Sequence, residues 1–230
     1  MMNKKIVIVG ASTGIGKALV EKAANSENNK IIALSRKTEL MDEQFEKYKN
    51  VSSHYLDLEK LNAIDIENIL SDKGPIDILI NNAGYLVNKP FQEMNREDFL
   101  KSFQINILGI MEFIQHCLPH LNKEFAHIIN ISSMGGFQGS SKFPGLTVYS
   151  SSKAAMCGFT EVFAEEYKDS HTHMNCLCLG AVQTDMLEKA FPGYQATVKP
   201  EEMASYIYDF ALNQGKLRNG EIVPVSLATP

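Results

Sequence analysis

A tyrosine and a lysine stand four positions apart in the stretch YSSSK, which covers residues 149–153. If the stretch is helical, the side chains of Tyr149 and Lys153 lie on one face, one turn apart. A phenol can give a proton to the oxygen of a carbonyl group that is being reduced, but its ordinary pKa of about 10 is high for this role at neutral pH. An ammonium group about 5 Å away, at an effective dielectric of about 20, favours the phenolate by roughly 3 kcal/mol and so lowers the pKa. The pair is therefore a candidate acid/base centre, with an ordinary solvated helix face as the alternative.

A glycine-rich turn, GASTGIG at residues 10–16, follows the first apolar run of the chain. Glycine allows a sharp turn and lets backbone N–H groups and a helix N-terminus approach a pyrophosphate closely. The position of this turn between a predicted strand and a predicted helix indicates a dinucleotide cofactor. The spacing is G-x-x-x-G-x-G, and glycines that serve only the path of the chain are the alternative interpretation.

The elements that would position these groups alternate along the chain. Short β-rich runs are separated by longer segments with helical spacing of apolar residues. The runs cover residues 4–10, 30–35, 52–58, 76–84, 127–133, 174–180 and 221–226. Strands that are apolar throughout are typical of parallel strands with both faces buried, and right-handed crossovers then place helices on both faces. The pattern predicts the α/β class, as a single Rossmann domain over residues 1–230 with a doubly wound parallel sheet of about seven strands.

Two long irregular stretches are predicted within this alternation, at residues 133–145 and 184–200. Ligands bind at the carboxyl ends of the strands in such sheets, so we expect both stretches to lie beside the site. The second stretch is expected either to form an apolar lid or to pack on the domain itself, through Met186, Leu187, Phe191 and Tyr194.

Five motifs occur in order along the chain: GASTGIG, NNAG at 81–84, Asn106, ISS at 131–133 and YSSSK. Together they resemble the ordered signature of the classical short-chain dehydrogenase/reductase family, over nearly the whole chain. The resemblance implies an enzyme that interconverts a carbonyl and a secondary alcohol of a small-molecule substrate by hydride transfer. Ketoacyl thioesters, steroids, pterins and small ketones all remain open as substrates. A cofactor-bound sensor or scaffold without turnover is the alternative, because a fold does not determine a function.

The resemblance also implies roles for four residues. Tyr149 corresponds to the acid/base of the family, and Ser133 to the serine that hydrogen-bonds the substrate oxygen. Lys153 corresponds to a lysine that also holds the nicotinamide ribose, and Asn106 to an asparagine that supports a water-linked proton relay. The presence of all four favours the enzyme, because a sensor has no need of a proton donor.

The candidate cofactor-binding residues follow from the same resemblance. They are Gly10, Ser12, Thr13, Gly14, Ile15, Gly16, Ser35, Arg36, Asp57, Leu58, Asn82, Ala83, Gly84, Tyr149, Lys153, Gly180, Val182 and Thr184. The chain departs from the family pattern at Leu179, where proline is usual, and the change frees φ and adds a hydrogen-bond donor. The segment from Ser133 to Tyr149 is about three residues longer than usual, which indicates either an enlarged substrate loop or a tolerated surface insertion.

The end of the second predicted strand governs the choice of cofactor. An acidic residue there would accept hydrogen bonds from the adenosine ribose and repel a 2′-phosphate. This chain has Ser35 instead, followed by Arg36 and Lys37. A hydroxyl and a guanidinium suit a phosphate, so NADP(H) is favoured over NAD(H). The alternative is that Arg36 only decorates a loop, and Thr13 supplies no second basic residue in the glycine turn.

Composition and charge exclude several classes of protein. The 230 residues carry a formal net charge of -5 and their lysines and arginines are scattered, so no nucleic-acid partner is expected. No run approaches the roughly 18 apolar residues that span a bilayer, so we expect no membrane partner and a cytoplasmic location. A homodimer or homotetramer is expected, because the predicted helices within residues 96–121 and 149–167 carry more apolar residues than one sheet face requires.

No metal site is predicted. The four cysteines have no CxxC spacing, and we interpret them as small buried apolar residues: Cys117, Cys157, Cys176 and Cys178. His171 and His173 share a strand-like face but lack a third ligand, so a surface turn is expected there.

Overall fold

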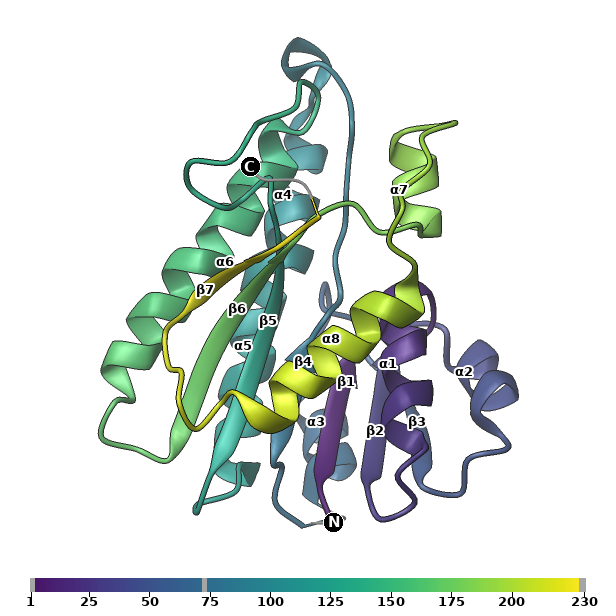
Figure 1. Cartoon of the computed structure of the whole chain (residues 1–230), viewed down its shortest axis with the longest axis vertical. Helices are drawn as coiled ribbons and strands as arrows, with labels where there is room; N and C mark the ends of the chain where they lie inside the picture. Colours follow the sequence, from purple (N-terminus) through teal and green to yellow (C-terminus); the bar gives the residue numbers. More distant parts are fainter. Residues whose placement is uncertain (1–2, 72–73, 228–230) are drawn as a thin grey trace.

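The structure is a computed structural model, and it describes residues 3–71 and 74–227. It contains one sheet of parallel strands in the order β3-β2-β1-β4-β5-β6-β7. The strands are β1 (Lys5–Val9), β2 (Lys30–Ser35), β3 (Val51–Tyr55), β4 (Ile78–Asn81), β5 (Ala126–Ser133), β6 (Thr172–Leu179) and β7 (Ile222–Val225). The order reverses between β1 and β4, at the switch point where ligands bind in doubly wound sheets (Figure 1). The predicted fold class is confirmed, and the ends of the predicted domain, 1–2 and 228–230, lie outside the described residues.

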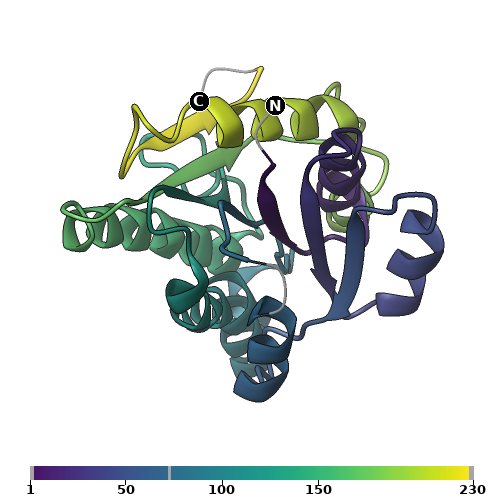
Figure 2. The ribbon, with the colours of Figure 1, turned by 90° about the horizontal axis from the view of Figure 1, so that it is seen from below.

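Helices cover both faces of the sheet, in three layers (Figure 2). Side chains of α1, α2 and α8 form one apolar cluster with one face, and side chains of α3, α5 and α6 form a second cluster with the other. The helices are α1 (Gly14–Ala24), α2 (Thr38–Phe45), α3 (Ala63–Leu70), α4 (Arg96–Phe103), α5 (Gly109–Cys117), α6 (Thr147–Glu166), α7 (Asp185–Ala190) and α8 (Pro200–Asn213), with short 3-10 turns at Phe91–Glu93 and Leu118–His120. Among the described residues, no helix is both long and apolar enough to cross a bilayer.

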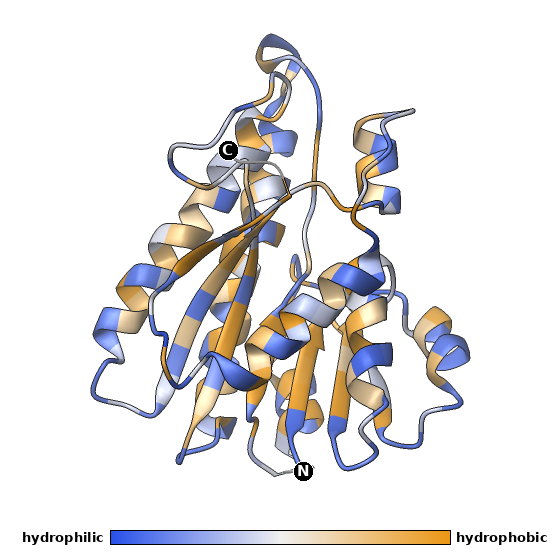
Figure 3. Ribbon diagram, in the orientation of Figure 1, coloured by the Kyte–Doolittle hydropathy of each residue, from blue (hydrophilic) through white to orange (hydrophobic). Residues whose placement is uncertain are grey.

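Alternate residues of the central strands pack into the two clusters. In β1, Ile6 and Ile8 join the cluster of α1 and α8, whereas Val7 and Val9 join the cluster of α5 and α6. Figure 3 shows the same apolar character along the central strands. Each fully buried aliphatic side chain contributes about 1.5–3 kcal/mol relative to an exposed one. The sheet is therefore a rigid platform, and the loops at its carboxyl edge are the segments that it positions.

The long helix predicted ahead of β5 is interrupted near its centre. A π-helical turn, Gln104–Leu108, separates α4 from α5. The Nε2 of Gln104 donates to the carbonyl of Leu58 at 3.1 Å, and Gly109 passes so close to the same carbonyl that a Cβ there would overlap it. The wider turn accommodates this close approach and places Asn106 at its centre, fully buried.

The two stretches predicted to be irregular differ from each other. Between β5 and α6 the chain has only turns and bends, as predicted. The prediction for residues 184–200 is wrong in part, because this stretch contains α7. Thr184 caps that helix, and its Oγ1 accepts a hydrogen bond from the N–H of Leu187 at 3.3 Å. A short helix rather than a loop therefore carries Met186 above the carboxyl edge.

The surface turn predicted at His171 and His173 is also only half correct. β6 begins at Thr172, so His173 lies within the strand, and its Nδ1 is 2.7 Å from the carbonyl oxygen of Gly215. His171 precedes the strand and is exposed. His173 therefore takes its orientation from β6, and only His171 lies outside that strand.

Candidate active site

The predicted catalytic residues converge at the carboxyl edge of the sheet. Ser133 is the last residue of β5, and Tyr149 and Lys153 lie in the first two turns of α6. Tyr149 is 9% exposed and Lys153 is 3% exposed. A solvated helix face is therefore excluded as an explanation of YSSSK, and two buried polar side chains require a specific role.

The hydroxyl of Ser133 lies near enough to the Tyr149 phenol to influence its pKa, and its Oγ accepts a hydrogen bond from the N–H of Gly135 at 3.1 Å. Burial raises the pKa of Tyr149 above its ordinary value, and the neighbouring Ser133 hydroxyl opposes that shift only in part. The expectation that Lys153 gives this tyrosine a lowered pKa is wrong for this structure, because loss of hydration outweighs the polar contacts. Tyr149 is therefore held as the neutral phenol, which is the form that can donate a proton.

Lys153 is anchored to β5. Its Nζ donates to the carbonyl of Ile131 at 2.8 Å, and the Oγ of Ser132 donates to the backbone carbonyl of Lys153 at 2.8 Å. Burial lowers the pKa of Lys153 to about 8. A Cβ built on Gly84 would lie 3.5 Å from the Nζ, so the predicted NNAG segment passes directly beside this ammonium group.

Asn106 connects the loop after β4 to α6. Its Nδ2 donates to the carbonyl of Tyr85 at 2.8 Å and to the Oγ of Ser152 at 2.9 Å, and its Oδ1 accepts from the N–H of Tyr85 at 2.7 Å. Ser152 in turn donates to the carbonyl of Tyr149 at 2.8 Å. In this structure the amide of Asn106 therefore positions the backbone around Tyr149 and Lys153.

Sequence reasoning missed Ser152, which is fully buried, although it belongs to the quoted YSSSK motif. The available signal was its position three residues after Tyr149, which places it on the same side of a helix. Ser132, the neighbour of Ser133, is engaged with α6, because its Oγ donates to the backbone carbonyl of Lys153.

The glycine turn and the NNAG segment are packed together. Gly10 has φ of +82°, and a Cβ there would lie 2.6 Å from the Cα of Ala83. The Nδ2 of Asn82 donates to the carbonyl of Gly10 at 3.0 Å, and a Cβ on Gly16 would overlap that carbonyl. Two segments about 70 residues apart thus form one continuous surface at the switch point between β1 and β4.

The N-terminus of α1 lies at this surface. Thr13 is the N-cap residue but makes no side-chain cap, and the first turn contains no acidic residue. Backbone N–H groups at such a terminus attract an anion. This part of the site fits the pyrophosphate of a dinucleotide.

Arg36 follows β2 at the edge of the site, and it already has a partner that sequence reasoning missed. Its Nη1 lies 3.3 Å from the Oε2 of Glu59, and the two side chains are 56% and 29% exposed. Ser35 donates to the Oγ of Ser12 at 2.9 Å, which ties the end of β2 to the glycine turn. The Oδ1 of Asp57 accepts from the N–H of Glu59 at 3.0 Å. An exposed ion pair contributes about 0–1 kcal/mol, so a ligand phosphate can displace the Glu59 carboxylate from Arg36.

The segment after β6 completes the edge of the site. Leu179 ends β6 and is buried, so leucine continues the strand where proline is usual. The N–H of Gly180 donates to the carbonyl of Val225 at 2.9 Å, and Val182 is buried at 5% exposure. A Cβ on Gly14 would lie 3.2 Å from the Cγ2 of Thr184, so α7 starts directly against the glycine turn.

Three segments above the site are fastened to one another. The Nδ2 of Asn88 donates to the carbonyl of Ala190 in α7 at 2.8 Å, and the N–H of Lys89 donates to the carbonyl of Gly145 at 3.1 Å. Gly145 has φ of +86°, and a Cβ there would overlap the Oδ1 of Asn88. We call this set of contacts the Asn88 latch. The latch connects α7 to the turn-rich segment that precedes α6. The longer Ser133–Tyr149 segment therefore helps to cover the site.

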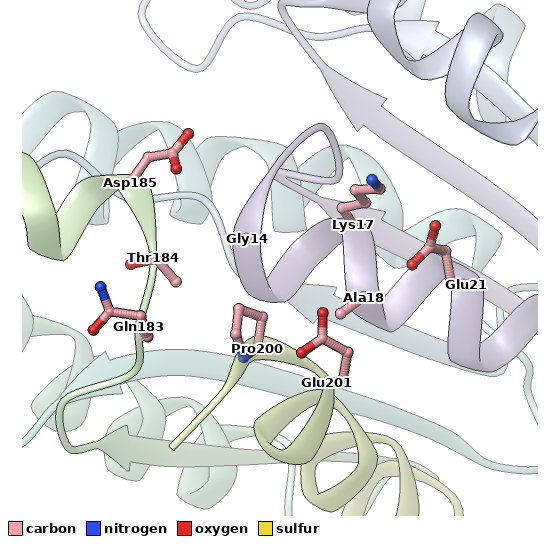
Figure 4. A pocket seen from close by; sticks show the side chains of 9 residues that line it. All are labelled: Gly14, Lys17, Ala18, Glu21, Gln183, Thr184, Asp185, Pro200 and Glu201. Atoms are coloured by element: carbon pink, nitrogen blue, oxygen red, sulfur yellow. The ribbon is translucent and has the colours of Figure 1, made fainter. Parts of the chain in front are cut away.

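A pocket of about 210 Å³ opens beside the glycine turn (Figure 4). It lies between the N-terminal parts of α1, α7 and α8 and is lined by Gly14, Lys17, Ala18, Glu21, Gln183, Thr184, Asp185, Pro200 and Glu201. Neither Tyr149 nor Lys153 lines it. This pocket therefore adjoins the proposed pyrophosphate position and is separate from the acid/base pair.

A doubly wound parallel sheet with a glycine turn after its first strand, and with a serine beside a buried Tyr-Lys pair at its carboxyl edge, defines a nicotinamide-dependent oxidoreductase. The chain belongs to the short chain dehydrogenase family, whose model matches residues 4–195. The resemblance of the five motifs is thereby confirmed. The chain is similar to the 3-oxoacyl-[acyl-carrier-protein] reductase FabG of Thermotoga maritima, with 28% identity over 96% of each chain.

Solved structures agree with this assignment of the fold. A structure described as ElxO with NADP bound is 26% identical, covers 98% of each chain and has a TM-score of 0.84. A 3-ketoacyl-(acyl-carrier-protein) reductase from Brucella melitensis complexed with NADH is 21% identical, with a TM-score of 0.85 and 97% of each chain covered. The same fold thus occurs with either nicotinamide cofactor.

Proposed function

We propose that this protein is an NADP(H)-dependent oxidoreductase that interconverts a carbonyl and a secondary alcohol, with Tyr149 as the acid/base. The observation that supports this most directly is the convergence of Ser133, at the end of β5, with the buried side chains of Tyr149 and Lys153, one turn apart on α6. A nicotinamide cofactor supplies or accepts the hydride when it is bound. The side chains of the protein then have to orient the substrate oxygen and move one proton.

Each of the three residues has a distinct task in this proposal. The Ser133 hydroxyl holds the carbonyl oxygen of the substrate, and the neutral Tyr149 phenol donates its proton to that oxygen during reduction. The resulting phenolate is stabilised by the Lys153 ammonium, because an opposite charge nearby favours the ionised form. Asn106 keeps the backbone of α6 and the Gly84 segment in register around that lysine.

The preference for NADP(H) is supported by the end of β2. Ser35 and Arg36 stand where an acidic residue would repel a 2′-phosphate, and Arg36 is held at that edge by Glu59. A phosphate carries about two negative charges and binds a guanidinium through two parallel hydrogen bonds, so it competes well with one exposed carboxylate. Glu59 is therefore proposed as a gate that a 2′-phosphate displaces.

Assembly into a homodimer or homotetramer is proposed from an apolar helix surface. Leu100, Leu108 and Met111, on α4, the π turn and α5, are 57%, 51% and 36% exposed. We call these three residues the α4–α5 patch. Val162 on α6 is 67% exposed as well. Burial of such groups against a second copy would remove them from water, which is the driving force for most subunit association.

The activity is tested by following NADPH oxidation with a panel of carbonyl compounds that includes a 3-oxoacyl thioester, a small diketone and a steroid ketone. We expect turnover with at least one compound. Tyr149→Phe keeps the ring and removes the hydroxyl, so turnover should fall about 10² to 10⁴-fold while NADPH affinity is retained. Lys153→Ala should weaken both turnover and cofactor binding. A Tyr149→Phe variant with full activity would reject the mechanism, and NADPH binding without turnover on a broad panel would favour the sensor.

A further inference from the structure

Three of the four cysteines gather at one place in the core. Cys157 of α6 and Cys176 and Cys178 of β6 are all buried, and their three sulfur atoms lie within 4.8 Å of one another. The Sγ atoms of Cys157 and Cys178 are separated by 3.6 Å. The fourth, Cys117, is buried in α5 and is not part of this group. Sequence analysis did not detect the group, because its two halves lie about 20 residues apart on different elements.

The group is held by regular structure rather than by loops. Cys176 and Cys178 alternate with Leu177 along β6, so both side chains project from the face of the sheet that α6 covers. Cys157 lies one turn after Lys153, and its sulfur is 3.5 Å from the carbonyl of Lys153. A helix and a strand fix ligand positions more closely than mobile segments do.

The ligand set selects one class of ion. It contains three sulfur atoms, and within residues 3–71 and 74–227 no histidine or carboxylate joins it. Zinc in structural sites takes four ligands, and calcium and magnesium take oxygen, whereas thiolates select Cu(I) and other soft ions. With metal–sulfur bonds of about 2.3 Å, three ligands in one plane with the ion would be about 4 Å apart, which lies within the 4.8 Å limit on the separations of the three sulfur atoms.

We propose that Cys157, Cys176 and Cys178 form a binding site for one soft metal ion, with Cu(I) as the ion that the three-sulfur set fits best. On binding, the thiol protons pass to solvent and the sulfur–copper bonds take their place, with no change of oxidation state. The Lys153 ammonium interacts electrostatically with all three cysteines and offsets part of the negative charge of the thiolates. Cys157 is 9% exposed and is the point of entrance, since the other two are fully covered.

The position of the site gives it a consequence for catalysis, which rests on the proposed function. A bound ion fixes the positions of the three sulfur atoms and so shifts the helical turn that joins Cys157 to Lys153. Under the proposed function the copper-loaded protein is therefore less active. Binding itself is independent of that function and is measured without any substrate or cofactor.

The test uses the full chain, reduced and kept free of oxygen, and titrates it with Cu(I) in competition with a chromogenic Cu(I) chelator. We expect one Cu(I) per chain and an ultraviolet thiolate-to-copper absorption band. Cys157→Ser and Cys157→Ala should each weaken Cu(I) binding by at least about 100-fold. Replacing a residue that only hydrogen-bonds a metal ligand already lowers metal affinity about 10–100-fold, and here a ligand itself is removed. Cys117→Ser is the matched control and should bind as the wild type does.

Two other results would overturn the proposal. Equal copper retention by the wild type and both Cys157 variants would show that the three sulfur atoms do not form the site. Absence of bound copper in the reduced wild type, with all four thiols still titratable, would show that the group only packs in the core. Circular dichroism of each variant shows whether it is folded. The alanine variant serves as a second test, because a serine at this position would bury a polar hydroxyl and could destabilise the fold.

Discussion

Acidification should destabilise the protein through His127, a histidine of β5 that is 1% exposed. Its Nδ1 lies 3.0 Å from the carbonyl oxygen of Ala211, and its Nε2 lies 2.9 Å from the Nδ2 of Asn175. The Oδ1 of Asn175 accepts from the N–H of Glu221, which fixes the orientation of the amide. A carbonyl only accepts and an NH₂ group only donates, so the ring is neutral and carries its proton on Nδ1. A second proton would face the donating Asn175, in a fully buried site.

The size of the effect follows from the pKa of this histidine. Burial, with a smaller contribution from His173, lowers the pKa of His127 to about 4, against about 6.5 in an unfolded chain. The unfolded state therefore binds the proton first as the pH falls. This stability contribution is fully present above about pH 6.5 and is lost progressively toward about pH 4. Linkage gives a loss of about 2 kcal/mol at pH 5 relative to pH 7, and about 3 kcal/mol when the loss is complete.

Urea unfolding at pH 7 and pH 5 measures this loss as a change in the free energy of unfolding. His127→Phe should be less stable than the wild type at pH 7, because Ala211 and Asn175 lose a partner, but its further loss at pH 5 should be about 2 kcal/mol smaller. His171→Gln is the matched control, since His171 is exposed, and it should keep the wild-type pH dependence. The other histidines are common to all three proteins. An identical pH dependence in His127→Phe would refute the reasoning.

Four other predictions concern the site and the assembly. Arg36→Ala should erase most of an at least tenfold tighter binding of NADPH over NADH, and equal dissociation constants in the wild type, by titration, would contradict the preference. Because burial lowers the pKa of Lys153 to about 8, turnover should fall as the pH rises through about 8, and a pH–rate profile that is flat across that value would be inconsistent with a charged lysine. Gly145→Ala should weaken the Asn88 latch, because of its positive φ and the overlap with Asn88, and should raise KM more than it lowers kcat, whereas unchanged steady-state kinetics would remove the latch from the site. Light scattering at micromolar concentration should give a dimer or tetramer, and a monomeric mass would reject the role of the α4–α5 patch.

Much of the fold could be predicted because its signals are local. Each buried strand is a short apolar run, and β2, for example, is predicted at its observed bounds, Lys30–Ser35. The differences arise where distant contacts act. The predicted strand ending at Gly84 is too long, because the chain leaves the sheet at Asn82, whose side chain hydrogen-bonds Gly10. The helix ahead of β5 is predicted as continuous, because nothing local indicates its π turn, which depends on the distant carbonyl of Leu58.

The candidate site shows the same limit in its polar contacts. Spacing alone placed Tyr149 and Lys153 on one helical face, and the family pattern supplied the partners Ser133 and Asn106. Neither indicated that burial, rather than the neighbouring ammonium, would dominate the pKa of the tyrosine. Desolvation depends on everything packed around a group, so the spacing of two residues cannot give its size. A buried phenol with a raised pKa retains its proton at neutral pH, and the same burial strengthens the charge interaction with the ammonium once that proton has left. The environment therefore suits a group that donates its proton during reduction and recovers it afterwards.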